Sequence, residues 1–354
     1  MTDAVGCLLE LTIAASIAVV LIALLRGPLR RIAGARAAYG LWLMLPLSTL
    51  TVLLPTPPHP IAPVVGVMPV LPAGADSANN ETVAFAIWVA GVIVMLAIAV
   101  RRQRAFVRSL GKLSRLPNGT YRSAGAREPM VVGALRPRVI VPADFELRYT
   151  RDERELVLAH ERAHVNRGDA LINAIATGWL CLSWFNPLMH RAIGWFRFDQ
   201  ELACDALVLA ATGTARRRYA DALLKTQLAA DSIGAAVPAG CHWQSTHPLT
   251  QRIAALKRPL PGTIRRWFGM ALVLSLVSSG CYAAWAARPQ VQAAAEPDTA
   301  QTIPTQVRQA LLTLPAAREI ALEPLGQLLQ SSAPVKKTQT RRCKLSRTKA
   351  RATS

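Results

Sequence analysis

The sequence contains little charge for its length. Only 18% of its 354 residues are Asp, Glu, Lys or Arg, whereas 52% are hydrophobic and the mean hydropathy is positive. So little charge is unusual for an ordinary soluble protein. A chain of this length can hold two domains, or one domain together with membrane segments, and its composition favours the second arrangement.

Cysteine and acidic residues are also scarce. The six cysteines are scattered and form no Cys-x-x-Cys pair, so neither a disulfide framework nor a cysteine-based zinc site is indicated. Lys and Arg outnumber Asp and Glu by 41 to 21, which leaves a formal net charge of +20. Such an excess indicates nucleic acid or an anionic membrane surface as partner. Most of the excess flanks apolar segments or lies in the C-terminal tail, so we expect membrane lipids and no direct nucleic-acid partner.

Four apolar segments have the length of a membrane-spanning helix, which is roughly 20 residues. The first begins after Asp3 rather than after Lys or Arg and has no cleavage-like ending, so it reads as a retained helix and not as a signal peptide. The alternative is that these segments are buried core helices of a soluble protein. The four segments are residues 5–25, 37–54, 83–100 and 268–287.

The charges between these segments predict an orientation in the membrane. Residues 55–82 contain no Lys or Arg, whereas residues 26–36 and 101–115 are rich in arginine. Lys and Arg concentrate in cytoplasmic loops, which places the N-terminus and the Pro-rich loop outside. The predicted domains are then residues 1–100 with three membrane helices, 101–267 in the cytoplasm, 268–287 as the fourth helix, and 288–354 as a short disordered extracytoplasmic tail.

One short motif carries chemistry. His160 and His164 lie four residues apart, and Glu161 follows the first histidine directly. On a helix, positions i and i+4 share one face, so both imidazoles can reach one metal ion while the glutamate lies beside it. This constellation is typical of zinc peptidases, although a chance pair of surface histidines is the alternative.

The surrounding residues predict an α+β domain. Residues 101–115 mix arginines with apolar side chains and suggest a helix on the membrane surface. Two β-rich runs, residues 130–132 and 139–141, predict a small hairpin. Residues 153–165 have a helical apolar period, which puts the histidine motif on a helix.

The next apolar stretch, residues 169–189, resembles a fifth span, but a single crossing would carry the following acidic segment to the far side. Asn186 and Pro187 break the helix, so we expect residues 171–196 to form a bent, membrane-proximal hairpin. This hairpin would return Glu201 to the histidines as the third zinc ligand. Asp205 lies one turn further along the same face.

Six segments, taken together and in order, resemble the BlaR/MecR-type antirepressor metallopeptidases, which are integral-membrane gluzincins. They cover most of residues 129–253 and read PMVVGALRPRVIVP (129–142), ELVLAHERAHVNRGD (155–169), WFNPL (184–188), DQELACDA (199–206), YADALL (219–224) and HPLTQRI (247–253). The resemblance implies a mainly α, integral-membrane protein. Four transmembrane helices would carry a cytoplasmic α+β gluzincin-like domain in the bacterial inner membrane.

The resemblance also implies roles for individual residues. His160, His164 and Glu201 would bind Zn²⁺, which makes a water molecule acidic enough to ionise near neutral pH. Glu161 would then be the general base and the proton shuttle to the leaving amine.

Further residues have weaker assignments. Asp205 would orient a ligand histidine, and Asp169 would either do the same or be a plain helix-terminal charge. His247 would stabilise an oxyanion or be an ordinary loop histidine. Residues 139–141 would be an edge strand that pairs with substrate, or a core strand. Cys204 is expected to pack rather than to bind metal.

The resemblance implies a signal-responsive, membrane-anchored zinc endopeptidase that cleaves a cytoplasmic repressor, itself, or both in response to an envelope signal. Only 67 residues follow Ala287, too few for the penicillin-binding sensor domain of the family's beta-lactam-sensing members. Two alternatives stay open. One is a quality-control or peptide-processing protease, and the other is a transmembrane signalling scaffold with a structural zinc site.

Overall fold

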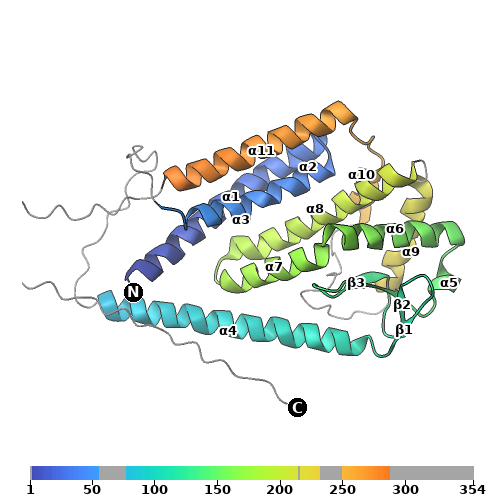
Figure 1. Cartoon of the computed structure of the whole chain (residues 1–354), viewed down its shortest axis with the longest axis horizontal. Helices are drawn as coiled ribbons and strands as arrows, with labels where there is room; N and C mark the ends of the chain where they lie inside the picture. Colours follow the sequence, from blue (N-terminus) through green and yellow to red (C-terminus); the bar gives the residue numbers. More distant parts are fainter. Residues whose placement is uncertain (1, 56–76, 214–215, 232–248, 288–354) are drawn as a thin grey trace, which may run out of the picture. The chain divides into compact units, whose positions relative to one another are not determined.

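The computed structural model describes residues 2–55, 77–213, 216–231 and 249–287. The chain divides into two units, Met1–Gln290 and Val291–Ser354, and the second unit lies outside the described residues, as does the predicted disordered tail. The first unit is mainly helical, with one small sheet. Figure 1 shows its helices in sequence colours.

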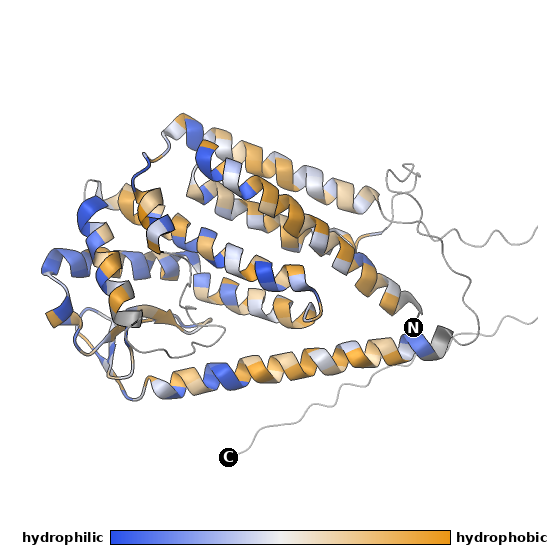
Figure 2. Ribbon diagram, turned by 180° about the vertical axis from the view of Figure 1, so that it is seen from behind, coloured by the Kyte–Doolittle hydropathy of each residue, from blue (hydrophilic) through white to orange (hydrophobic). Residues whose placement is uncertain are grey.

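Among the residues that the structure describes, three helices are long and apolar enough to cross a membrane. They are α1 (Thr2–Ile32), α4 (Ser77–Ser109) and α11 (Thr263–Ala286). Figure 2 shows that hydrophobic residues dominate most of their length. The first, third and fourth predicted segments are therefore long apolar helices, as their hydropathy indicates.

The second predicted segment is helical but interrupted. It is divided into α2 (Ala35–Gly40), the 3₁₀ turn η1 (Leu41–Leu43) and α3 (Met44–Thr51). Pro46 has no N–H to donate to the carbonyl one turn earlier, at Trp42, which accounts for the irregular turn at this position. None of the three pieces reaches membrane-spanning length alone, so a fourth span stays a prediction.

An apolar core joins α1 and α11 to residues 33–44 and to the helix that contains Phe196. Trp42 and Phe196 meet edge to face, with ring centroids 5.6 Å apart. At Gly269 of α11, an added Cβ would come within 2.5 Å of the Ala33 side chain, so the two segments touch closely there. The buried members of this core are Ala15, Ala18, Val19, Ile22, Leu29, Ala33, Leu41, Trp42, Met44, Met189, Ala192, Phe196, Val273 and Val277.

The basic stretch after the third apolar segment does not form the separate surface helix that we predicted. Residues 101–109 continue α4 without interruption, and Leu113–Arg115 is strand β1. No glycine or proline interrupts this stretch before Gly111. The backbone of Gly111 has φ 67°, a left-handed conformation that ends the helix.

The sheet has four short strands in the order β1-β2-β4-β3. Strands β3 (Met130–Val132) and β4 (Arg138–Pro142) pair antiparallel, with Val131 opposite Val139, which confirms the predicted hairpin. Strand β2 (Tyr121–Ser123) pairs parallel to β4 on its other side and antiparallel to β1. Residues 139–141 therefore lie inside the sheet, and their prediction as an edge strand for substrate is wrong.

Six helices complete the described chain. Helix α6 carries the predicted motif, and α7 and α8 form the predicted bent hairpin. Asn186 caps α8 by accepting a hydrogen bond from the Leu188 amide at 3.0 Å, and Pro187 takes the first helical position. The helices are α5 (Phe145–Arg148), α6 (Arg151–Arg167), α7 (Asp169–Leu182), α8 (Pro187–Thr212), α9 (Arg216–Asp231) and α10 (Leu249–Leu256).

The start of α6 is held by a capping box and an ion pair. Thr150 and Glu153 exchange hydrogen bonds between side chain and backbone, and the Lys225 ammonium donates to both Glu153 oxygens at 2.6 and 2.8 Å. Burial opposes ionisation of Glu153, but Lys225 and the Thr150 amide outweigh it, so the pKa of this carboxyl lies below its ordinary value. The fold therefore favours the charged form.

Glu153→Gln is expected to lower the free energy of unfolding by up to about 1 kcal/mol at pH 7, because glutamine keeps the capping box but loses the ion pair. A lowered folded-state pKa stabilises the fold above the unfolded value of about 4.3 and loses that effect as pH falls through the folded value. Thermal unfolding of the detergent-solubilised protein at pH 7 and near pH 3 checks this. An equal shift at both pH values would contradict it, and Glu155→Gln, at an exposed position of α6, is the control.

Candidate metal centre

Helix α6 presents the predicted histidine motif toward the interior. His160 and His164 lie one turn apart, and their Nε2 atoms approach to 3.1 Å. Gly168 ends the helix with φ 69°, a left-handed conformation that lets Asp169 begin α7 immediately. Both imidazoles are buried, with 6% and 4% of their residue surface exposed. The i, i+4 spacing thus places the two rings at one point.

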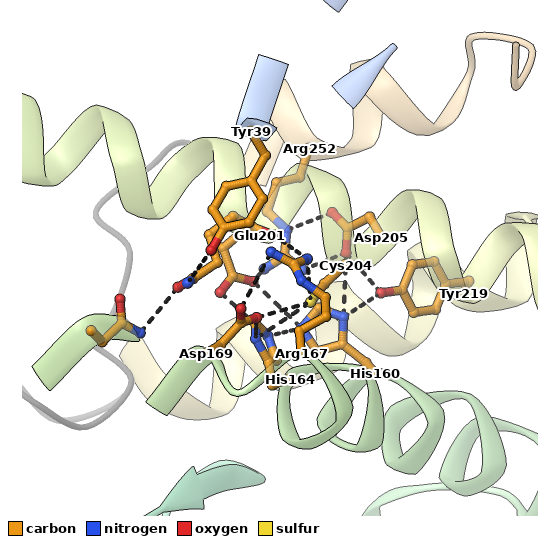
Figure 3. Close-up of polar contacts among 12 residues, drawn as sticks. Tyr39, His160, His164, Arg167, Asp169, Glu201, Cys204, Asp205, Tyr219 and Arg252 are labelled. Carbon is orange, nitrogen blue, oxygen red and sulfur yellow. Dashed lines mark hydrogen bonds and ion pairs between the residues drawn. The ribbon is translucent and has the colours of Figure 1, made fainter. Parts of the chain in front are cut away.

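Helix α8 brings Glu201 to the same point. Its Oε2 lies 3.4 Å from His160 Nε2, and its Oε1 lies 3.6 Å from His164 Nε2. Glu201 is 4% exposed and comes 37 residues after His164 in sequence. Figure 3 shows the three side chains converging from α6 and α8. The α7–α8 hairpin therefore returns the glutamate to the histidines, as predicted.

This donor set fits a zinc ion. Around tetrahedral zinc with bonds of about 2.0–2.1 Å, neighbouring ligand atoms lie about 3.3 Å apart. The two Nε2 atoms lie 3.1 Å apart, and the two Glu201 oxygens lie 3.4 and 3.6 Å from one Nε2 each, all close to this value. Two imidazoles and a carboxylate are also the ligand types that zinc accepts, and their donor atoms lie within 4.8 Å of one another.

The outer nitrogens of both histidines are held by polar partners. His164 Nδ1 lies 2.7 Å from Asp169 Oδ2. His160 Nδ1 lies 2.8 Å from the Tyr219 hydroxyl, which donates to Asp205 Oδ1 at 2.7 Å. Each Nδ1 therefore donates outward, and each Nε2 faces the centre; in the neutral ring this is the tautomer that metal binding requires.

The electrostatics of the centre also favour a cation. Burial lowers the tendency of His164 to protonate, but the Glu201 charge and the Asp169 hydrogen bond outweigh it and raise the pKa of His164 well above its ordinary value. Glu201 and Asp169 thus stabilise a positive charge at His164. They would stabilise a divalent cation bound beside it in the same way.

Arg252 of α10 connects two acidic residues of α8. It donates two hydrogen bonds to Asp205, at 2.9 and 2.7 Å, and its Nη1 lies 3.2 Å from Glu201 Oε2. Burial disfavours the charged guanidinium, but Asp205 and Glu201 outweigh this and raise the pKa of Arg252. Arg252 and Tyr219 were not among the predicted site residues. Both lie in segments that resemble the family, but no local sequence pattern places either of them beside the histidine motif.

The remaining predicted residues have distinct surroundings. Glu161 is 5% exposed, and its Oε2 has no hydrogen-bond partner among the residues that the structure describes. Cys204 is fully buried, 3.4 Å from His164 Nδ1, and accepts from Arg167 at 3.2 Å. Burial raises the pKa of this thiol, so it stays neutral at His164. His247 lies outside the described residues.

Asp169 and Asp205 differ in how directly they reach a histidine. The Asp169 carboxylate contacts His164 itself, and it also pairs with Arg167 at 3.3 Å. Asp205 lies 3.5 Å from His160 Nδ1 and reaches it chiefly through the Tyr219 hydroxyl. Both carboxylates thus lie next to a predicted ligand, where they can fix its orientation.

Comparison with known proteins identifies the family. The model of the family described as BlaR1 peptidase M56 matches residues 7–256. Regulatory protein BlaR1 of Bacillus licheniformis is 28% identical over 156 residues, which cover 38% of this chain and 26% of that protein. The methicillin resistance mecR1 proteins of Staphylococcus aureus and Staphylococcus epidermidis are each 26% identical over 107 residues, or 30% of this chain and 18% of theirs. The aligned part thus spans about a quarter or less of these relatives. Since the family model matches more than half of the sequence, the chain belongs to the BlaR1 peptidase M56 family.

Proposed function

We propose that this protein is a membrane-anchored zinc endopeptidase that cleaves a cytoplasmic protein, either a transcriptional repressor or its own chain. One observation carries the proposal. In a member of a peptidase family, the side-chain nitrogens of His160 and His164 and the carboxylate of Glu201 approach one another to 3.1–3.6 Å. The buried carboxylate of Glu161 follows His160 directly in sequence. A structural zinc site needs no such additional carboxylate.

The mechanism divides the work among the residues of the centre. His160, His164 and Glu201 would hold the zinc ion, which supplies Lewis acidity toward water and the scissile carbonyl. Glu161 would take a proton from the attacking water and pass it to the leaving amine, since its Oε2 has no other partner among the described residues. Asp169 and Tyr219 hold the two imidazoles in the required tautomer, and Arg252 fixes Glu201 and Asp205.

Metal removal tests the proposal. The purified, detergent-solubilised full chain, tagged at both ends, is incubated alone and with an unfolded protein such as casein. We expect discrete fragments of casein, of the chain itself, or of both, which disappear with a zinc chelator and return when zinc is added. If tightly bound zinc is present but neither casein nor the chain itself is cut, the result favours the signalling scaffold with a structural zinc site over the peptidase. Cleavage that persists with chelator identifies a contaminating protease.

The placement in the membrane is a second part of the proposal. The three long apolar helices and the arginines at the C-terminal ends of α1 and α4 support a multi-pass protein of the bacterial inner membrane with residues 101–267 in the cytoplasm. Membrane lipids would surround α1, α4 and α11, which expose large apolar side chains such as Ile17, Ile93 and Leu274.

Reporter fusions test this placement and the number of spans. Alkaline phosphatase, which folds only outside the cytoplasm, is fused after residue 70 and after residue 115. We expect high activity at residue 70 and background activity at residue 115, because the first position follows two predicted spans and the second follows three. A third fusion, after residue 34, tests the number of spans: we expect background activity there, whereas the same activity at residues 34 and 70, from fusions of equal abundance, would show that residues 37–54 do not cross the membrane.

A further inference from the structure

Tyr39 connects the predicted second membrane segment to the metal centre. It belongs to α2, more than a hundred residues before the histidine motif in sequence, yet its side chain points into the network around His164 (Figure 3). Its ring lies against Phe196 of α8, with centroids 5.7 Å apart. Two separate routes run from this side chain to the metal ligands.

The first route passes through a cation. The Arg167 guanidinium lies 4.3 Å from the centroid of the Tyr39 ring, a cation–π contact. Arg167 Nη2 lies 3.3 Å from Asp169 Oδ1, and Asp169 Oδ2 lies 2.7 Å from His164 Nδ1. The tyrosine ring thus covers the cation that neutralises the carboxylate holding His164.

The second route passes through Gln200, the residue before Glu201. The Tyr39 hydroxyl accepts a hydrogen bond from Gln200 Nε2 at 3.2 Å, and Gln200 Oε1 accepts one from Asn173 at 3.0 Å. The backbone carbonyl of Gln200 accepts a hydrogen bond from Arg167 at 3.3 Å. Gln200 is 2% exposed, so these bonds fix the rotation of α8 at the position of Glu201.

We propose that Tyr39 is a positioning residue of the metal centre, contributed by the membrane segment rather than by the peptidase domain. The inference rests on the proposed function, because it concerns the same zinc ligands. If Tyr39 has this role, the metal centre is complete only while α2 packs on α8. A displacement of α2 from α8 would therefore weaken the hold on zinc.

Zinc affinity of the purified full chain, measured by competition with a chromogenic chelator, tests the inference without relying on activity. Loss of an outer partner of a ligand weakens metal binding about 10–100-fold, so we expect Tyr39→Leu to lose about tenfold. Tyr39→Phe keeps the ring over Arg167 and is expected to stay within about threefold. Tyr282→Leu is the control, since Tyr282 is exposed on α11 and contacts Trp285.

Arg167→Lys weakens the same contacts between Tyr39 and Asp169. It is the test variant if Tyr39→Leu does not fold. Lysine cannot match the planar contacts of Arg167 with Tyr39, Asp169 and Gln200, so we expect about a tenfold loss there too, and none for Arg151→Lys. Unchanged zinc affinity in the folded Tyr39→Leu or Arg167→Lys protein overturns the inference and leaves the peptidase proposal intact. By contrast, a wild-type chain that binds zinc without cutting protein overturns the peptidase proposal and leaves the role of Tyr39 at the metal centre intact.

Discussion

Glu161→Gln is expected to lower the rate of peptide-bond cleavage by about 10²–10⁴-fold while the zinc content stays unchanged. General acid–base catalysis by a positioned side chain contributes a factor of this size. Glutamine has almost the same shape as glutamate but cannot accept a proton at neutral pH. Because Glu161 is not one of the three residues whose donor atoms converge, its amide form should leave the ligand set in place.

The measurement compares cleavage of the doubly tagged chain and of casein with zinc content in the same preparation. Glu155→Gln is the matched control, because Glu155 lies on the same helix but is exposed and only loosely paired with Arg151, at 3.8 Å. We expect this control to cleave normally. Wild-type cleavage by the zinc-loaded Glu161→Gln protein would contradict the role of Glu161 and favour another base.

His164→Ala is expected to weaken zinc binding by more than about a hundredfold and to abolish cleavage. Loss of an outer partner already costs 10–100-fold, and His164 supplies a ligand atom itself. The substitution also leaves Asp169 buried at 1% exposure without its imidazole, so some loss of stability accompanies the loss of metal. His160→Ala should behave alike, since its Nε2 occupies the equivalent position.

Zinc content after dialysis, together with thermal unfolding with and without added zinc, checks this prediction. We expect zinc to raise the unfolding temperature of the wild type but not of either variant, because a ligand stabilises only the state that binds it. His190→Ala is the control, as His190 is exposed on α8 and contacts the Trp184 carbonyl at 2.8 Å. If the His164→Ala protein retains zinc, the metal binds at a different site.

The sequence by itself determined the features that depend on neighbours along the chain. The i, i+4 spacing of His160 and His164 places both rings on one face of whatever helix carries them. Hydropathy marked four apolar segments, of which three are long helices, and the Asn186-Pro187 pair marked the turn between α7 and α8. Glu201 was also found, because it belongs to an acidic segment that the hairpin returns to the motif.

Only the tertiary structure decided what depends on packing between distant segments. Tyr39, Tyr219 and Arg252 reach the centre from α2, α9 and α10, and no spacing relates them to the histidines. The parallel pairing of β2 with β4 could not be predicted for the same reason. Strand β2 has only three residues, too few for a recognisable strand pattern. A side chain's role in such a network is set by which elements bury it together, and local sequence patterns carry no record of that.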